Sequence, residues 1–104
     1  MDKINAINLS VQYLKRLKEN KISFSDAWLF GSYAKNLQTA DSDIDLAIIL
    51  EDNAQKNFET EVQLMVIRNK EETLIEPHVF TKEEFQQKTP IVQQIIQNGE
   101  RIKV

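Results

Sequence analysis

The sequence predicts an α/β fold in which a small mixed sheet of three main strands is flanked by helices, in the order α-β-α-β-α-β-α. Short apolar runs typical of strands alternate with longer segments whose apolar residues follow helical spacing. Only two glycines and two prolines occur in 104 residues, which argues against disorder. A chain of this length has ordinary single-domain size, so we expect one domain over residues 1–104.

The first half of the chain begins with an amphipathic helix, which we expect over about residues 2–19. We interpret its apolar face as core packing rather than as a groove for a partner. A short buried strand at 27–30 is closed by Gly31, and a short helix is expected at 32–37. The apolar face of the first helix consists of Ile4, Ile7, Val11, Leu14 and Leu17.

The second strand, expected at residues 44–50, is almost wholly apolar after its acidic start, which is typical of a central strand covered on both faces. Helical spacing returns at about 55–69, and a third strand is expected at 73–80. A full helix between these two strands suits a parallel crossover. Pro77 removes a backbone donor from the third strand and therefore predicts an edge position.

The C-terminal part carries clear helix signals. Thr81 and Glu84 form a capping box for a short helix. Pro90 is typical of the first position of a further helix, and Gly99 of its end. The last residues, 102–104, indicate a small terminal strand.

The composition excludes several classes of protein. A net charge of −3 gives no general attraction to nucleic acid, so we expect no direct nucleic-acid partner. There are no cysteines, and therefore no disulfides or thiolate metal sites. The sequence has no long apolar stretch of the kind found in signal peptides and membrane spans, so a cytoplasmic location is expected.

Two aspartates open the second strand. Asp43 and Asp45 are two residues apart, so on a strand their side chains project to the same side, with Cα atoms roughly 6–7 Å apart. Two such carboxylates repel each other unless a cation lies between them, and Mg²⁺ suits that role. An isolated pair of this kind more often merely solvates the start of a strand.

The glycine turn before these aspartates favours the metal interpretation. Gly31 lets the chain turn sharply and approach a ligand closely. Ser32 would begin the expected helix, where free N–H groups attract phosphate. If this turn and Asp43 and Asp45 share a site, the first two strands must run antiparallel. The combination indicates a site for a nucleoside triphosphate and a divalent metal.

Residues 29–35 (LFGSYAK) and 42–46 (SDIDL) resemble the signature of the DNA polymerase beta-like nucleotidyltransferase superfamily, and the short chain is similar to its minimal nucleotidyltransferase branch. The resemblance covers about residues 25–80. It implies the nucleotidyltransferase fold and two Mg²⁺ ions. It also implies transfer of a nucleoside monophosphate from ATP or another NTP to a hydroxyl, with release of pyrophosphate.

The resemblance also assigns roles to the acids. Asp43 and Asp45 would bind metal, and a third carboxylate is expected on a later strand. Glu76 is the only acid in the apolar run of the third strand, so it would bind the catalytic metal and help to deprotonate the acceptor hydroxyl. His78 should share its side of the strand, and we interpret it as a packed or hydrogen-bonded residue.

Gly31 and Ser32 would hold the triphosphate, with Lys35 as a further phosphate contact. The chain departs from the family at two positions of this turn. Asn36 stands where the family usually has glycine, and Lys35 where arginine is commoner. Asparagine tolerates left-handed backbone angles, so the turn is expected to survive.

Domains of this branch are often paired with a HEPN-type partner protein, sometimes as a toxin–antitoxin system. The resemblance therefore implies transfer of AMP to such a partner, with this chain as the antitoxin. Two alternatives stay open: a non-catalytic antitoxin that acts by binding, and a subunit of a small-molecule nucleotidyltransferase. The edge strand and the N-terminal helix would also permit a homodimer.

Overall fold

The apolar runs form a four-stranded mixed sheet in the computed structural model, which describes residues 1–104. Its strand order is β3-β2-β1-β4. β1 pairs antiparallel with β2 and β4, whereas β2 and β3 are parallel, so both predicted strand directions are confirmed. β3 lies at an edge, as Pro77 predicts. The strands are β1 (Phe24–Phe30), β2 (Ile44–Leu50), β3 (Ile75–Phe80) and β4 (Glu100–Ile102).

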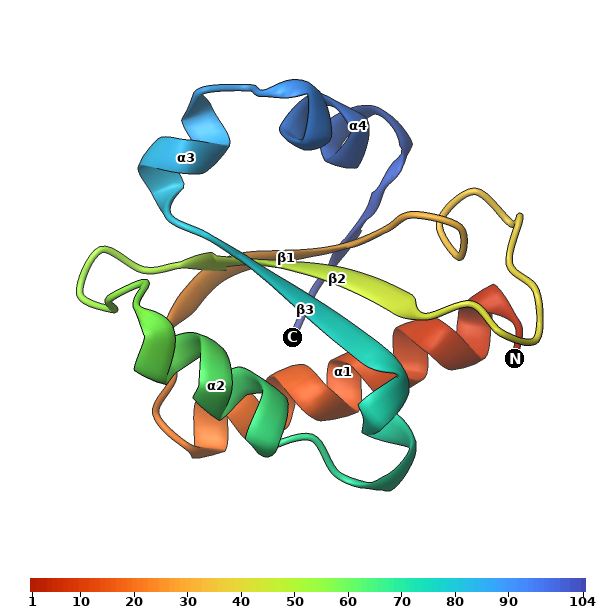
Figure 1. Cartoon of the computed structure of the whole chain (residues 1–104), viewed down its shortest axis with the longest axis horizontal. Helices are drawn as coiled ribbons and strands as arrows, with labels where there is room; N and C mark the ends of the chain where they lie inside the picture. The colour runs from red at the N-terminus through yellow and green to blue at the C-terminus, as the bar shows by residue number, and fades with distance from the viewer.

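The helices lie in two layers, one on each side of the sheet (Figure 1). α1 (Lys3–Glu19) and α2 (Phe58–Val66) cover one face, and α3 (Lys82–Gln86) and α4 (Pro90–Asn98) lie over the other. A 3₁₀ helix, η1 (Lys70–Leu74), leads into β3. The predicted capping box of α3 and the proline at the start of α4 are confirmed. No helix has the length and hydrophobicity needed to cross a bilayer.

The main core lies between the sheet and α1 and α2. It joins 17 buried residues, whereas the cluster under α3 and α4 has only three, so most of the packing free energy comes from the first face. The hydroxyl of Tyr13 in α1 donates to the carbonyl oxygen of Leu64 in α2 (2.5 Å). Ile4 does not belong to this core, because the buried stripe of α1 runs through Ala6, Ser10 and Tyr13 instead.

The helix expected at residues 32–37 is absent. The chain makes a single helical turn there, which Asn36 ends in the left-handed region (φ +58°). The N–H of Leu37 donates to the carbonyl oxygen of Ser32 (2.9 Å), and that of Asn36 to Tyr33 (3.4 Å). This pair of hydrogen bonds is the Schellman pattern that ends helices. The asparagine therefore keeps the backbone conformation for which glycine is usual, but it limits the helical conformation to a single turn.

Candidate functional site

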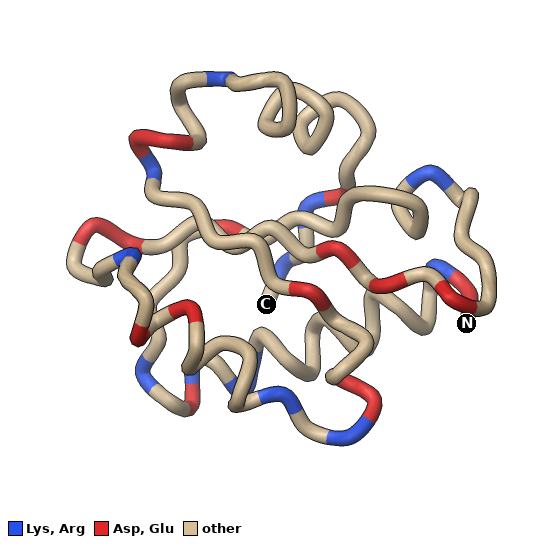
Figure 2. Tube along the Cα trace, in the orientation of Figure 1, with Lys and Arg blue, Asp and Glu red and all other residues tan.

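Asp45 and Glu76 lie directly beside each other on the parallel strands β2 and β3. Their neighbours Ile44, Leu46 and Ile75 are fully buried in the main core, so both acids point to the opposite face, on the side of α3 and α4. Figure 2 shows acidic positions close together where these two strands begin. The structure therefore places two of the three predicted carboxylates on one face, at one end of the sheet.

A histidine completes this acidic group. Ligand atoms of Asp45, Glu76 and His78 all lie within 4.8 Å of one another. Asp43 precedes β2, is exposed, and does not join the group. Oxygen donors at this spacing fit a hard divalent cation, which is held by one or two carboxylates and takes its remaining ligands from phosphate and water. The two carboxylates thus fit the metal that the sequence predicts.

His78 contacts Asp45 across the strand pair. Its Nε2 lies 3.1 Å from Oδ1 of Asp45, and its ring packs edge-on against Phe30, with ring centroids 4.9 Å apart. The sequence predicts that His78 shares the side of Glu76, but not that it touches Asp45. That contact depends on the register between β2 and β3, which places His78 opposite Ala47, two residues beyond Asp45.

Gly31 is required at its position for two reasons. Its φ is +74°, a conformation that favours glycine. A Cβ there would also overlap Oδ2 of Asp45, because Phe30 pairs directly with Asp45 and the chain turns immediately afterwards. The glycine therefore lets the turn lie directly against the carboxylate.

The turn that follows leaves two backbone donors without a partner in the chain. Ser32 is half-buried and Lys35 is exposed. The N–H groups of Ser32 and Tyr33 donate no hydrogen bond within the chain. Lys3 of α1 donates to the carbonyl oxygen of Ala34 (3.2 Å) and so ties the turn to the first helix. Because no helix begins at Ser32, a phosphate would meet free turn donors rather than a helix N-terminus.

A different acid, Glu72, has no part in this site. It is fully buried where η1 meets α1, and it accepts hydrogen bonds from Gln12 (2.6 Å), Arg16 (2.9 Å) and the backbone N–H of Asn69 (3.0 Å). Burial by itself would raise the pKa of Glu72, but the hydrogen bonds outweigh it and lower the pKa. Glu72 therefore fixes the segment that leads into β3 and Glu76.

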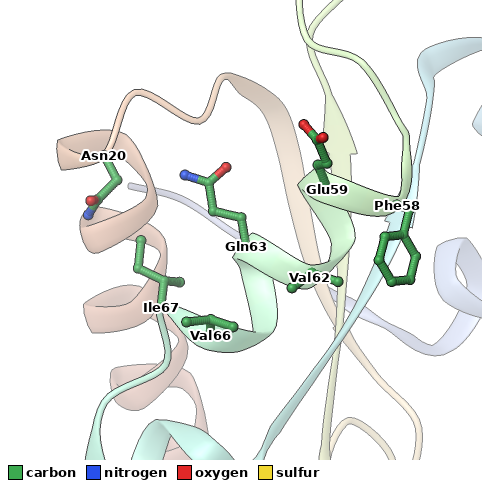
Figure 3. A pocket seen from close by; sticks show the side chains of 7 residues that line it. All are labelled: Asn20, Phe58, Glu59, Val62, Gln63, Val66 and Ile67. Atoms are coloured by element: carbon green, nitrogen blue, oxygen red, sulfur yellow. The ribbon is translucent and has the colours of Figure 1, made fainter.

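A largely apolar hollow lies away from the acidic group, between α2 and the end of α1 (Figure 3). Helical spacing of apolar residues predicts α2 correctly, but only Leu64 of this helix is buried. Phe58 and Val66 remain 79% and 76% exposed. The hollow is lined by Asn20, Phe58, Glu59, Val62, Gln63, Val66 and Ile67.

The mixed sheet, the glycine turn and the acids on two neighbouring strands define an α/β domain of the kind that transfers nucleotides. The sequence matches the family model described as nucleotidyltransferase domain over residues 11–102, and the chain belongs to this family, within the DNA polymerase beta-like superfamily. The protein is thus a nucleotidyltransferase. No curated protein is a significant match to the sequence.

Solved structures share the fold at low sequence identity. A candidate nucleotidyltransferase from Sulfolobus solfataricus has a TM-score of 0.67 at 13% identity, covering 95% of this chain and 80% of its own. A toxin–antitoxin structure with AMP-PNP has a TM-score of 0.66 at 20% identity, and the match covers 93% of this chain and 72% of that one. A double mutant of the toxin–antitoxin MntA-HpeT has a TM-score of 0.61 at 18% identity, and the match covers 88% of this chain and 70% of that one.

Proposed function

We propose that this protein transfers a nucleoside monophosphate, AMP from ATP, to a hydroxyl group on a separate protein, with Mg²⁺ as its cofactor. The observation that carries this proposal is the placement of Asp45 beside Glu76, with the turn at Gly31 against the Asp45 carboxylate. It brings the metal-binding oxygens and the free N–H groups of the turn to the same end of the sheet.

In this proposal Asp45 and Glu76 hold metal, and Asp43 reaches the same ions from just before β2. Mg²⁺ bound by these acids would stabilise charge on both the attacking and the leaving oxygen. The double mutant of MntA-HpeT carries Asp-to-Glu changes two positions apart, which is the spacing of Asp43 and Asp45. That spacing supports a shared role for the pair.

The turn would hold the triphosphate. Gly31 allows close approach of the backbone, Ser32 and Tyr33 offer free N–H groups, and Lys35 adds positive charge from an exposed position. A neighbouring fold of this kind was solved with AMP-PNP, an ATP analogue. We therefore assign ATP as the nucleotide substrate.

The reaction is a direct displacement. The acceptor oxygen forms a bond to the α-phosphorus, while the bond from that phosphorus to the bridging oxygen breaks and pyrophosphate leaves with its electron pair. The hydroxyl proton passes to a carboxylate oxygen of Glu76, which is exposed and so accessible to an acceptor.

We assign the acceptor to a HEPN-type partner protein, with this chain acting as the antitoxin. Two of the structural neighbours are toxin–antitoxin assemblies, and the exposed apolar side chains of α2 are suited to contact with a protein. The same apolar side chains favour a second candidate function, in which the chain neutralises its partner by binding alone.

Incubation with α-labelled ATP, Mg²⁺ and the product of the adjacent gene tests this proposal. Label should move onto that protein, and transfer should be lost in Asp45→Asn and Glu76→Gln variants. Glu83→Gln is the matched control, since Glu83 is an exposed acid of α3 that makes no contact with the acidic group. A tight complex without label would contradict the catalytic proposal and support binding alone.

A further inference from the structure

His78 is held in a fixed orientation at the edge of the acidic group. It projects from β3 on the same face as Glu76, and its ring packs edge-on against Phe30 (interplanar angle 68°). Its side chain is 30% exposed and that of Asp45 27%, so solvent and ions can reach both. The imidazole therefore presents its Nε2 toward the same space as the two carboxylates.

The spacing of the donors is close to that of ligands around one ion. In an octahedral site with metal–ligand bonds of about 2.1 Å, adjacent donors are about 3 Å apart and opposite donors about 4.2 Å. Nε2 of His78 is 3.1 Å from Oδ1 of Asp45, and the three donors of Asp45, Glu76 and His78 lie within 4.8 Å of one another. Small adjustments of these side chains would let one ion bind all three.

We infer that His78 supplies a nitrogen ligand to the metal, and that the site consequently prefers Mn²⁺ to Mg²⁺. This inference rests on the metal site of the proposed function. Mg²⁺ is a hard ion that favours oxygen ligands, whereas imidazole binds divalent transition metals well. Mn²⁺ accepts the octahedral, oxygen-rich arrangement that carboxylates and phosphates provide. As a transition-metal ion it also binds an imidazole nitrogen more strongly than Mg²⁺ does.

The alternative role for His78 is a hydrogen bond that only orients Asp45. In that case Nε2–H donates to the carboxylate and is not available to a metal. The two roles differ in one measurable property, which is whether a nitrogen nucleus lies in the coordination shell of the bound ion.

Pulsed electron paramagnetic resonance of Mn²⁺ bound to the untagged protein distinguishes these roles. His78 is the only histidine of the chain, so ¹⁴N modulation from a bound imidazole has a single source. The spectrum is recorded without nucleotide, which removes base nitrogens. We expect ¹⁴N modulation in the wild type and its loss in His78→Gln, with Mn²⁺ affinity lowered about ten-fold or more and Mg²⁺ affinity changed far less.

The outcomes separate this inference from the proposed function. Bound Mn²⁺ without ¹⁴N modulation in the wild type would overturn the inference and leave the carboxylate site intact, and this test needs no variant. Asp45→Asn should abolish the bound signal. If Mn²⁺ binding were unchanged in that variant, both the inference and the proposed metal site would be wrong. Thermal unfolding of each variant checks its fold.

Discussion

Acidic side chains on the two sides of the sheet have opposite surroundings. Glu72 lies on the side of the main core, is fully buried, and receives hydrogen bonds from Arg16 and Gln12. Asp45 and Glu76 lie on the other side, partly or fully exposed, with His78 as the neighbour of Asp45. One acid is surrounded by donors, and the others lie close to each other.

This difference predicts a structural role for Glu72 and a functional role for Asp45 and Glu76. A buried carboxylate is stable only when donors compensate for the loss of water, so Glu72 stabilises the fold through its partners. Carboxylates placed side by side on adjacent strands destabilise the protein slightly, since like charges repel. The proposed cation would offset this repulsion, so we expect substitutions of the two kinds of acid to affect different properties.

The largest expected effect is the loss of nucleotidyl transfer in Asp45→Asn. Metal ions supply several kcal/mol of transition-state stabilisation, so loss of a ligand should lower nucleotidyl transfer by about a thousand-fold or more. The free energy of unfolding should stay the same or rise slightly, because a repelling charge beside Glu76 is removed. Label transfer and urea unfolding measure the two quantities on the same preparation. If Asp45→Asn lowered the free energy of unfolding as well as the activity, Asp45 would have a structural role like that of Glu72, contrary to this expectation.

Most of the sheet could be predicted from local patterns. Apolar runs predicted the three main strands, and Pro77 predicted that the third lies at an edge. The expected shared site of Gly31 and Asp45 predicted that the first two strands are antiparallel. The helix after Gly31 could not be excluded, because Asn36 is compatible with a helix end as well as with a turn. Only the structure shows that its left-handed backbone comes so early in the segment.

The candidate site was predictable only in part, because strand register brings its members together. Asp45 and Glu76 were identified by residue type and position, whereas the contact of His78 with Asp45 spans 33 residues of sequence. Glu72 was missed altogether. Its partners Arg16 and Gln12 lie 56 and 60 residues away in the sequence, so no local pattern indicates its burial.

The second largest expected effect is the loss of stability in Glu72→Gln. The amide keeps the shape of the side chain but loses charge-assisted hydrogen bonds from Arg16 and the backbone N–H of Asn69, which should cost about 2–3 kcal/mol of stability. Transfer activity per folded molecule should change little. Denaturant unfolding measures the stability. Glu71→Gln, an exposed neighbour, serves as the control and should be nearly neutral.

Gly31→Ala should have an intermediate effect on stability and also weaken metal binding. The positive φ at this position should cost an alanine about 1–2 kcal/mol, and its Cβ would push the carboxylate of Asp45 out of place. Gly31→Asn separates the two causes, because asparagine tolerates the backbone angle but still carries a Cβ. Metal affinity that is normal in Gly31→Asn would show that the contact with Asp45 does not matter.

The smallest effect should be a difference in acid sensitivity between the wild type and Glu72→Gln. The pKa of Glu72 is lowered in the folded protein from its ordinary value of 4.5, although burial opposes this, because Arg16, Gln12 and the backbone N–H of Asn69 donate to its ionised form. The folded state therefore holds the proton less tightly than the unfolded chain. The resulting stability is fully present above about pH 4.5 and is lost as the pH falls through the lowered folded value. Unfolding in urea at pH 7 and at several values below 4.5 should show the two proteins converging in stability, since the glutamine has no proton to gain. A constant gap between them across this range would mean that packing, and not the charge of Glu72, accounts for its contribution.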